Sequence, residues 1–218
     1  YADALDAANK VINLGQYDLD SDFLNVFSMA GQDSPEIICT YEHVKTTYPF
    51  TDVIRFYNNA DGGWASFVPT QNLVDMFEME NGKTIDEPGS GYDPVHPFAN
   101  RDPRLKNTII YPGMDWIGRN DIPRIINPLD KTLPDGTANN DYYTAADNAS
   151  HTGLLWAKYL RPNQSQYSTS MNDDGLCPII FRYAEILLTK AECLVELNQD
   201  LQEALNIVDR LRIRGGHI

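Results

Sequence analysis

Several aromatic residues stand within three residues of a Gly-Gly, Pro-Gly or Asn-Asn pair, and such pairs are typical of turns and loops. A loop can expose an aromatic ring, and an exposed ring can lie flat against an apolar face of a ligand. The chemistry that this pattern favours is non-covalent binding. We favour Trp64 and Trp116 as binding rings, and the further candidates are Tyr57, Tyr142 and Tyr143.

Polar side chains that can complete such a site flank Trp116. Asp115, Arg119 and Asn120 present planar groups that can form paired hydrogen bonds with neighbouring hydroxyl groups. A solvated loop carries the same residue types, and each aromatic ring can instead pack its loop onto a scaffold. The sequence alone does not decide between a ligand-binding role and a structural role for these residues.

Two charged motifs are interpreted as structural. In Arg101-Asp102-Pro103-Arg104, Pro103 favours an extended Asp102 and orients the charged side chains for pairing within a loop. Arg182 and Glu185 are three residues apart at a helix start, so they can pair on one face or tie the loop-rich insertion to the helical hairpin predicted below.

The sequence predicts no zinc site and no cofactor. The cysteines Cys39, Cys177 and Cys193 have no metal-ligand spacing and are expected to be buried small hydrophobic residues, and the four His are scattered. A minor alternative is calcium at residues 18–22, where Asp alternates along the chain. The Gly and Glu of a calcium loop are replaced there by Phe23 and Met29.

Composition limits the class of protein. The 218 residues are 42% hydrophobic, which is enough for a substantial core, and 17 basic against 31 acidic residues give a net charge of -14. This charge repels phosphate backbones, so nucleic acid is excluded as a partner. No stretch approaches the roughly 20 apolar residues of a membrane-spanning helix. Residues 1–16 are polar, and we expect any export signal to have been removed.

Apolar residues at steps of three and four predict a helix from about Phe181 to Leu197. Asp200 and Glu203 are then predicted to form the capping box at the start of a second helix. This helix is predicted to end at Gly215-Gly216, where a glycine can adopt the left-handed conformation. These two helices are predicted to form an antiparallel hairpin.

The chain start is predicted to be a similar helix, ended by Gly15. Its Ala4-Leu5-x-x-Ala8 pattern matches Ala204-Leu205-x-x-Val208, as expected for members of a helical repeat. We therefore predict a mainly α fold in which residues 1–16 and 179–216 form a helical scaffold and residues 17–178 form one loop-rich insertion.

The insertion should contain ordered loops with short helices and strands. Eight of the 13 Pro lie between Pro88 and Pro134, which excludes long regular elements there. A short helix capped by Thr70 is predicted to end by Asn81-Gly82. Residues 135–150, rich in Asn, Asp, Thr and Ala, are predicted to form a mobile surface loop.

Three segments carry a resemblance to a known family. The pattern PTQNLVDMFEMENGKTI, then PFANRDPRLKNTIIYPG, then PIIFRYAEILLTKAECLVELN with EALNIVDRLRIRGG resembles the SusD/RagB family over nearly the whole chain. The resemblance implies a single domain fragment with a tetratricopeptide-like helical scaffold. It also implies a lipid-anchored, cell-surface protein of the outer membrane that captures nutrients, typically glycans, for a SusC-like TonB-dependent transporter. The lipidated Cys, the first repeats and the C-terminal tail of the family are expected to be absent here, so the membrane is a partner only through an anchor outside this chain.

In this context the aromatic candidates would stack on sugar rings, without catalysis. Two alternatives to glycan capture are the binding of a non-glycan nutrient, such as a peptide, and an accessory role beside a glycoside hydrolase. An enzyme is disfavoured because no Gly-x-Ser-x-Gly elbow, phosphate loop or recognisable acid pair is present. A protein-interaction scaffold is compatible with glycan binding, since the helices would contact the transporter while the insertion binds the nutrient.

Overall fold

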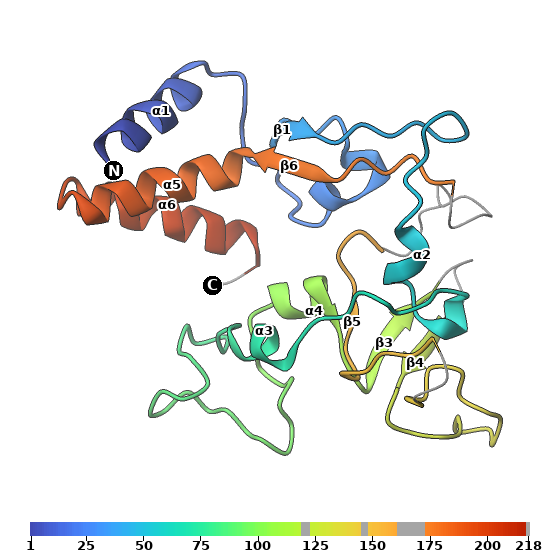
Figure 1. The fold of residues 1–218 in the computed structure, drawn as a ribbon. Coiled ribbons are helices and arrows are strands. Elements are labelled where there is room, and N and C mark those ends of the chain that lie inside the picture. Colours follow the sequence, from blue (N-terminus) through green and yellow to red (C-terminus); the bar gives the residue numbers. More distant parts are fainter. Residues whose placement is uncertain (119–122, 145–147, 161–172, 217–218) are drawn as a thin grey trace. The chain divides into compact units, whose positions relative to one another are not determined.

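The computed structural model describes residues 1–118, 123–144, 148–160 and 173–216. They form two compact units (Figure 1). The first unit contains Tyr1–Glu42 and Leu176–Ile218, and the second contains His43–Gly175. No helix among the described residues is long and apolar enough to cross a membrane.

The first unit is built on three helices, of which α5 (Tyr183–Glu196) packs against both α1 (Ala2–Asn13) and α6 (Leu201–Arg214). The stripes of apolar residues predicted from the sequence meet in one core. Its buried members are Tyr183, Ala184, Leu187, Ala191, Leu194, Ala204, Ile207 and Leu211.

The predicted helix boundaries are largely confirmed. The Asp200 carboxylate accepts a hydrogen bond from the Glu203 N–H at 3.1 Å, as expected of an N-cap. Gly15 follows α1 with a φ of 62°, and Gly216 follows α6 with a φ of 87°. Both glycines adopt the left-handed conformation that ends helices at low cost.

The predicted start of α5 is wrong by two residues. Residues Ile179–Arg182 form strand β6, which pairs antiparallel with β1 (Ile37–Thr40), and α5 begins at Tyr183. The Tyr183 N–H donates to the Glu36 carbonyl at 2.7 Å. A strand partner more than 100 residues away cannot be seen in a local apolar pattern.

Residues 17–42, which the sequence analysis placed in the insertion, belong to the helical unit. Short helices η1 (Asn25–Phe27) and η2 (Met29–Gly31) lie in this segment. The Glu36 side chain is fully buried, and Arg182 donates to it at 2.6 Å. Arg182 therefore joins this segment to the helices, which is one of the two roles predicted for it.

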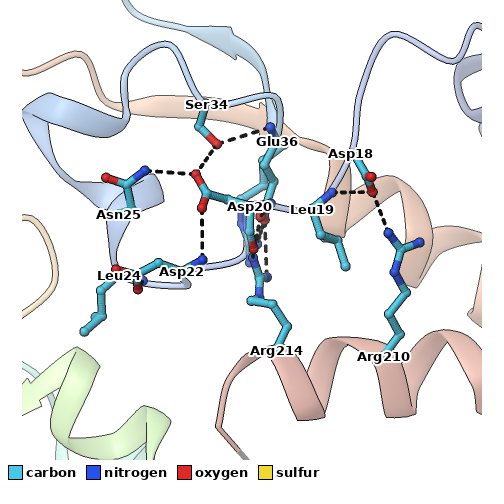
Figure 2. A network of polar contacts seen from close by, with 11 residues as sticks. Asp18, Leu19, Asp20, Asp22, Leu24, Asn25, Ser34, Glu36, Arg210 and Arg214 are labelled. Carbon is cyan, nitrogen blue, oxygen red and sulfur yellow. Dashed lines mark hydrogen bonds and ion pairs between the residues drawn. The ribbon is translucent and has the colours of Figure 1, made fainter.

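Figure 2 shows how acidic residues of the same segment are engaged. Asp20 accepts from the Asp22 N–H at 3.0 Å, the Asn25 amide at 3.0 Å and the Ser34 hydroxyl at 2.8 Å. Burial disfavours the charged carboxylate, but these hydrogen bonds, helped by the positive charge of Arg214, outweigh it and lower the pKa of Asp20. The carboxylate of Asp20 is thus used to organise the loop.

The cysteines are placed differently from one another. Cys177 and Cys193 are buried, as predicted, but Cys39 is exposed. The prediction for Cys39 is wrong because Cys39 lies in strand β1, whose pairing with β6 is irregular on both sides of Cys39, and its side chain stays exposed.

The second unit contains only short elements, as the Pro-rich sequence predicts. Its helices are α2 (Val53–Phe56), η3 (Asn59–Asp61), α3 (Gln71–Asp75) and α4 (Arg104–Thr108). Its described strands form two antiparallel pairs, β2 (Ile109–Ile110) with β5 (Leu155–Trp156), and β3 (Met114–Ile117) with β4 (Pro123–Ile126). Two apolar clusters hold these elements together.

Two predictions for this unit need correction. Thr70 caps α3 through its hydroxyl, but the helix ends at Asp75 rather than near Gly82. The described part of residues 135–150 is anchored, since Asn139 and Asp141 are both buried. The Asn139 amide donates to the carbonyls of Asn127 at 2.7 Å and Asp130 at 2.8 Å. Polar side chains here bond to backbone groups instead of water.

The Arg101 motif is structural, as predicted. Arg101 is 5% exposed and donates to the carbonyls of Pro97, Val74 and Phe77, each at 2.7 Å. Asp102 is buried and pairs with Arg104. These contacts fix the turn that precedes α4.

Candidate functional site

Two aromatic rings are exposed in the segment that follows η3. Trp64 and Phe67 are each 43% exposed. The segment is hydrogen-bonded to α2, because the Trp64 N–H donates to the Ile54 carbonyl at 2.8 Å and the Phe67 N–H to the Arg55 carbonyl at 3.2 Å. Two large apolar rings are thus held in water by a fixed backbone, a feature that indicates a binding surface.

A charged pair stands beside Phe67. The Arg55 guanidinium lies 5.6 Å from the centre of the Phe67 ring and pairs with Asp52 at 3.0 Å. Both charged side chains are about half exposed, at 45% and 48%. We call Asp52, Arg55, Trp64 and Phe67 the Trp64–Phe67 surface. It combines apolar ring faces with a planar donor and a planar acceptor.

Two predicted binding rings are in the core instead. Tyr57 is 3% exposed and Trp116 is 8% exposed, and both pack with Val53, Ala65 and Ile126. The prediction that loops expose these rings is wrong for both. Trp116 lies in β3 opposite Arg124. Alternate residues of a strand point to opposite faces, and the Trp116 side chain is on the face of the β3–β4 hairpin that packs into the core.

The other predicted residues lie elsewhere in the second unit. Tyr143 is 44% exposed, with its ring edge-on to His151 at 5.3 Å, and Tyr142 is half-buried. Asp115 is exposed in β3, opposite Ile125. Arg119 and Asn120 lie outside the described residues. The predicted group around Trp116 is therefore divided between the core and the surface.

Buried polar contacts connect the loop after Tyr57 with the loop that carries Tyr142 and Tyr143. Asp141 accepts from the Asn58 amide and from the Ala60 N–H, each at 2.8 Å. Burial raises the pKa of Asp141, although these two hydrogen bonds and the charge of Arg124 oppose the change. Arg124 also pairs with the buried Asp61 at 2.6 Å. These contacts fix both loops in the same unit.

Among the described residues, no group of three or more His, Cys, Asp or Glu can hold a metal ion. The calcium alternative at residues 18–22 has no support in the geometry. Asp18 accepts from the Leu19 N–H and pairs with Arg210 at 2.5 Å, while Asp20 is occupied by the donors described above. The carboxylates bind donors of the chain rather than converging on a common point (Figure 2).

The sequence matches the model of the SusD family over residues 29–217. The chain belongs to the SusD family. A mainly helical SusD-like fold, predicted from the sequence, agrees with long helices and few short strands. The tetratricopeptide-like character of the helices stays a prediction.

Several solved structures are similar to this SusD family chain. A SusD-like carbohydrate-binding protein from Bacteroides fragilis is 27% identical, with a TM-score of 0.79 over 97% of this chain and 40% of its own. A second SusD-like protein from B. fragilis is 24% identical, with a TM-score of 0.69 over 99% of this chain and 44% of its own.

Surface glycan-binding protein A from Bacteroides fluxus is 19% identical, with a TM-score of 0.58 over 97% of this chain and 40% of its own. The chain thus spans less than half the length of these solved relatives. No curated protein sequence matches it.

Sequence reasoning missed three residues of the Trp64–Phe67 surface, namely Phe67, Arg55 and Asp52. The spacing of Arg55 three residues after Asp52 was a usable signal for their ion pair. Nothing local indicated that Arg55 lies over Phe67, because the chain must first fold back onto α2.

Proposed function

We propose that this chain is the nutrient-binding part of a cell-surface protein that captures oligosaccharide or polysaccharide for a SusC-like TonB-dependent transporter. The protein is anchored to the outer membrane by lipid and performs no catalysis. The observation that carries the proposal is the pair of exposed rings, Trp64 and Phe67, in a SusD family chain similar to a carbohydrate-binding protein.

The Trp64–Phe67 surface suits a glycan physically. Sugar rings present C–H faces that pack on Trp and Phe, and their hydroxyl groups accept from Arg55 or donate to Asp52. Because the loop is already hydrogen-bonded to α2, little conformational entropy is lost when a ligand orders it. The net charge of -14 favours neutral glycans over polyanionic ones.

Support for a non-catalytic role comes from two of the buried carboxylates of the second unit. Asp61 and Asp141 are 6% and 5% exposed. The two oxygens of Asp141 accept from Asn58 and Ala60, and Asp61 is paired with Arg124. A glycosidase needs one carboxylic acid and one carboxylate that both reach the substrate. These two acids are engaged in holding loops.

Calorimetric titration with a panel of neutral and acidic polysaccharides and oligosaccharides tests the proposal, with reducing-sugar release followed in parallel. Trp64→Ala and Phe67→Ala should each weaken glycan binding about tenfold or more, since each removes a stacking face. Tyr1→Ala is the matched control, because it truncates a 59%-exposed aromatic residue of the first unit. It should leave affinity unchanged.

Three outcomes would contradict the proposal. Sugar release would show catalysis. Saturable binding of peptides, with none of any glycan, would favour the non-glycan alternative. Full glycan affinity in both ring variants would remove the Trp64–Phe67 surface from the site, and Tyr143→Ala would then test the other exposed ring.

The transporter partnership is tested separately. We propose that the helical unit contacts the SusC-like transporter while the second unit binds the nutrient. Trp64→Ala should therefore weaken glycan capture and leave co-purification with the transporter intact. Loss of both properties in this variant, with the protein folded, would contradict the division between the units.

A further inference from the structure

A cavity of about 130 Å³ lies in the second unit, beside the turn that carries the Arg101 motif. The residues that bear on its chemistry are Glu80, Phe98, Asn100, Leu105, Lys106 and Tyr111. It shares no residue with the Trp64–Phe67 surface. We call it the Tyr111 pocket.

One wall of the Tyr111 pocket is aromatic and rigid. The rings of Phe98 and Tyr111 stack with their centres 4.3 Å apart and their planes 12° from parallel. Both rings pack against the buried cluster that includes Leu105, which is 1% exposed. Burial raises the pKa of Tyr111, so its hydroxyl stays protonated at neutral pH and can both donate and accept.

The rim of the Tyr111 pocket carries polar groups of complementary kinds. Glu80 offers a carboxylate, Asn100 an amide and Lys106 an ammonium, and all three side chains are exposed. Within the part of the chain that the structure describes, neither these side chains nor the Tyr111 hydroxyl has a hydrogen bond or ion pair. Four groups are therefore available to a ligand, and the charges of Glu80 and Lys106 cancel.

The backbone beneath the rim is fixed. The Glu80 N–H donates to the Asn100 carbonyl at 2.8 Å, and Met79 forms a β-bridge with Arg101. Asn100 has a φ of 54°, a left-handed conformation held by these neighbours. Because Arg101 is bonded to three carbonyls, the turn cannot shift without breaking several buried contacts. The backbone at Glu80 and Asn100 is thus preorganised.

We propose that the Tyr111 pocket binds one neutral sugar residue, such as the end of a glycan chain. A volume of about 130 Å³ is below the roughly 300 Å³ at which pockets for drug-sized ligands begin, so an oligosaccharide does not fit inside. Sugar hydroxyls can donate to Glu80 and accept from Lys106, while a C–H face contacts the aromatic wall. A ligand with net charge would face one rim charge of the same sign.

Titration with methyl glycosides of neutral monosaccharides, followed by ligand-observed NMR and calorimetry, tests this site. Tyr111→Phe and Glu80→Gln keep the size and shape of the side chains while each removes one hydrogen-bonding group. Each should weaken monosaccharide binding about threefold to tenfold, as expected for one hydrogen bond. Tyr1→Ala, the control in the first unit, should leave monosaccharide binding unchanged, and Trp64→Ala is titrated in parallel.

Each alternative outcome overturns the proposal in a recognisable way. Absence of saturable monosaccharide binding to the folded protein would refute the site, and so would full affinity in both pocket variants. Loss of binding in Trp64→Ala would assign the monosaccharide to the Trp64–Phe67 surface. Glycine serves as a zwitterionic probe, and tighter binding of glycine than of every methyl glycoside would refute the sugar class.

The same titrations with a long glycan keep this proposal separate from the proposed function. If Tyr111→Phe and Glu80→Gln leave polysaccharide binding intact while the wild type fails to bind monosaccharides, only the Tyr111 pocket is refuted. If the polysaccharide also fails to bind, the proposed function is refuted as well.

Discussion

Arg214, near the end of α6, pairs with the fully buried carboxylate of Glu36, which lies 178 residues earlier in the chain. Arg182 pairs with the same carboxylate at 2.6 Å, and the Asp20 N–H donates to it at 3.1 Å. One buried acid therefore joins the end of the chain, the start of α5 and the loop after α1. Figure 2 shows Arg214 and Glu36 within this network.

Glu36→Gln should destabilise the first unit strongly. The change leaves two arginines near a neutral group, and breaking a buried ion pair from one side typically costs about 3 to 5 kcal/mol. Denaturant unfolding followed by circular dichroism would measure the loss of unfolding free energy. Asp6→Asn is the matched control, because the ion pair of Asp6 with Lys10 is exposed. Equal stabilities of the two variants would contradict a central role for Glu36.

Trp116→Ala should reduce stability rather than remove a binding surface. Trp116 is 8% exposed within the apolar cluster of the second unit, and truncating a buried Trp typically costs about 3 to 5 kcal/mol. Trp116→Phe should cost less and leave glycan affinity unchanged. Thermal unfolding and calorimetric titration of both variants would measure the two properties. A folded Trp116→Phe variant without glycan affinity would show that the ring contacts ligand after all.

Asp141 should make folding stability depend on pH. Its folded-state pKa is raised above 3.8 by burial, so the folded state binds the proton more tightly than the unfolded state. This contribution favours folding fully below pH 3.8 and is lost as pH rises through the folded pKa. Unfolding free energies of wild type and Asp141→Asn, compared from about pH 3 to about pH 7, isolate the contribution.

The unfolding free energy of the wild type, relative to that of Asp141→Asn, should fall as pH rises. Asp141→Asn also places an amide against the Asn58 amide. The free-energy cost of this contact does not depend on pH, so it adds a constant to the difference in unfolding free energy. A difference that stays constant over the whole range would show that Asp141 titrates normally.

Gly63→Ala should disturb the Trp64–Phe67 surface. A Cβ at Gly63 would collide with the backbone carbonyl and the Cβ of Tyr57. The collision should destabilise the second unit by about 1 to 3 kcal/mol and displace the residues that follow, weakening glycan affinity if that surface is the binding site. Thermal unfolding and titration would report both effects. Ser66→Ala, an exposed change in the same segment, serves as the control, and an equal melting temperature would refute the collision.

The sequence by itself determined the features that depend on neighbours within a few residues. The apolar stripes of α1, α5 and α6, the Asp200 cap and the Gly216 end follow from helix geometry, which repeats every 3.6 residues. The Pro-rich region excluded long elements for the same local reason. The motifs of residues 69–85, 97–113, 178–198 and 203–216 were specific enough to identify the SusD family.

Only the tertiary structure decided which aromatic rings are exposed. Trp64 and Trp116 both follow glycines at short range, yet the register of β3 with β4 buries Trp116, while the hydrogen bonds to α2 hold Trp64 at the surface. The partners of Glu36 were equally hidden, since Arg214 is far away along the chain. Burial and long-range pairing depend on how distant segments meet, and a local pattern of residue types does not contain that information.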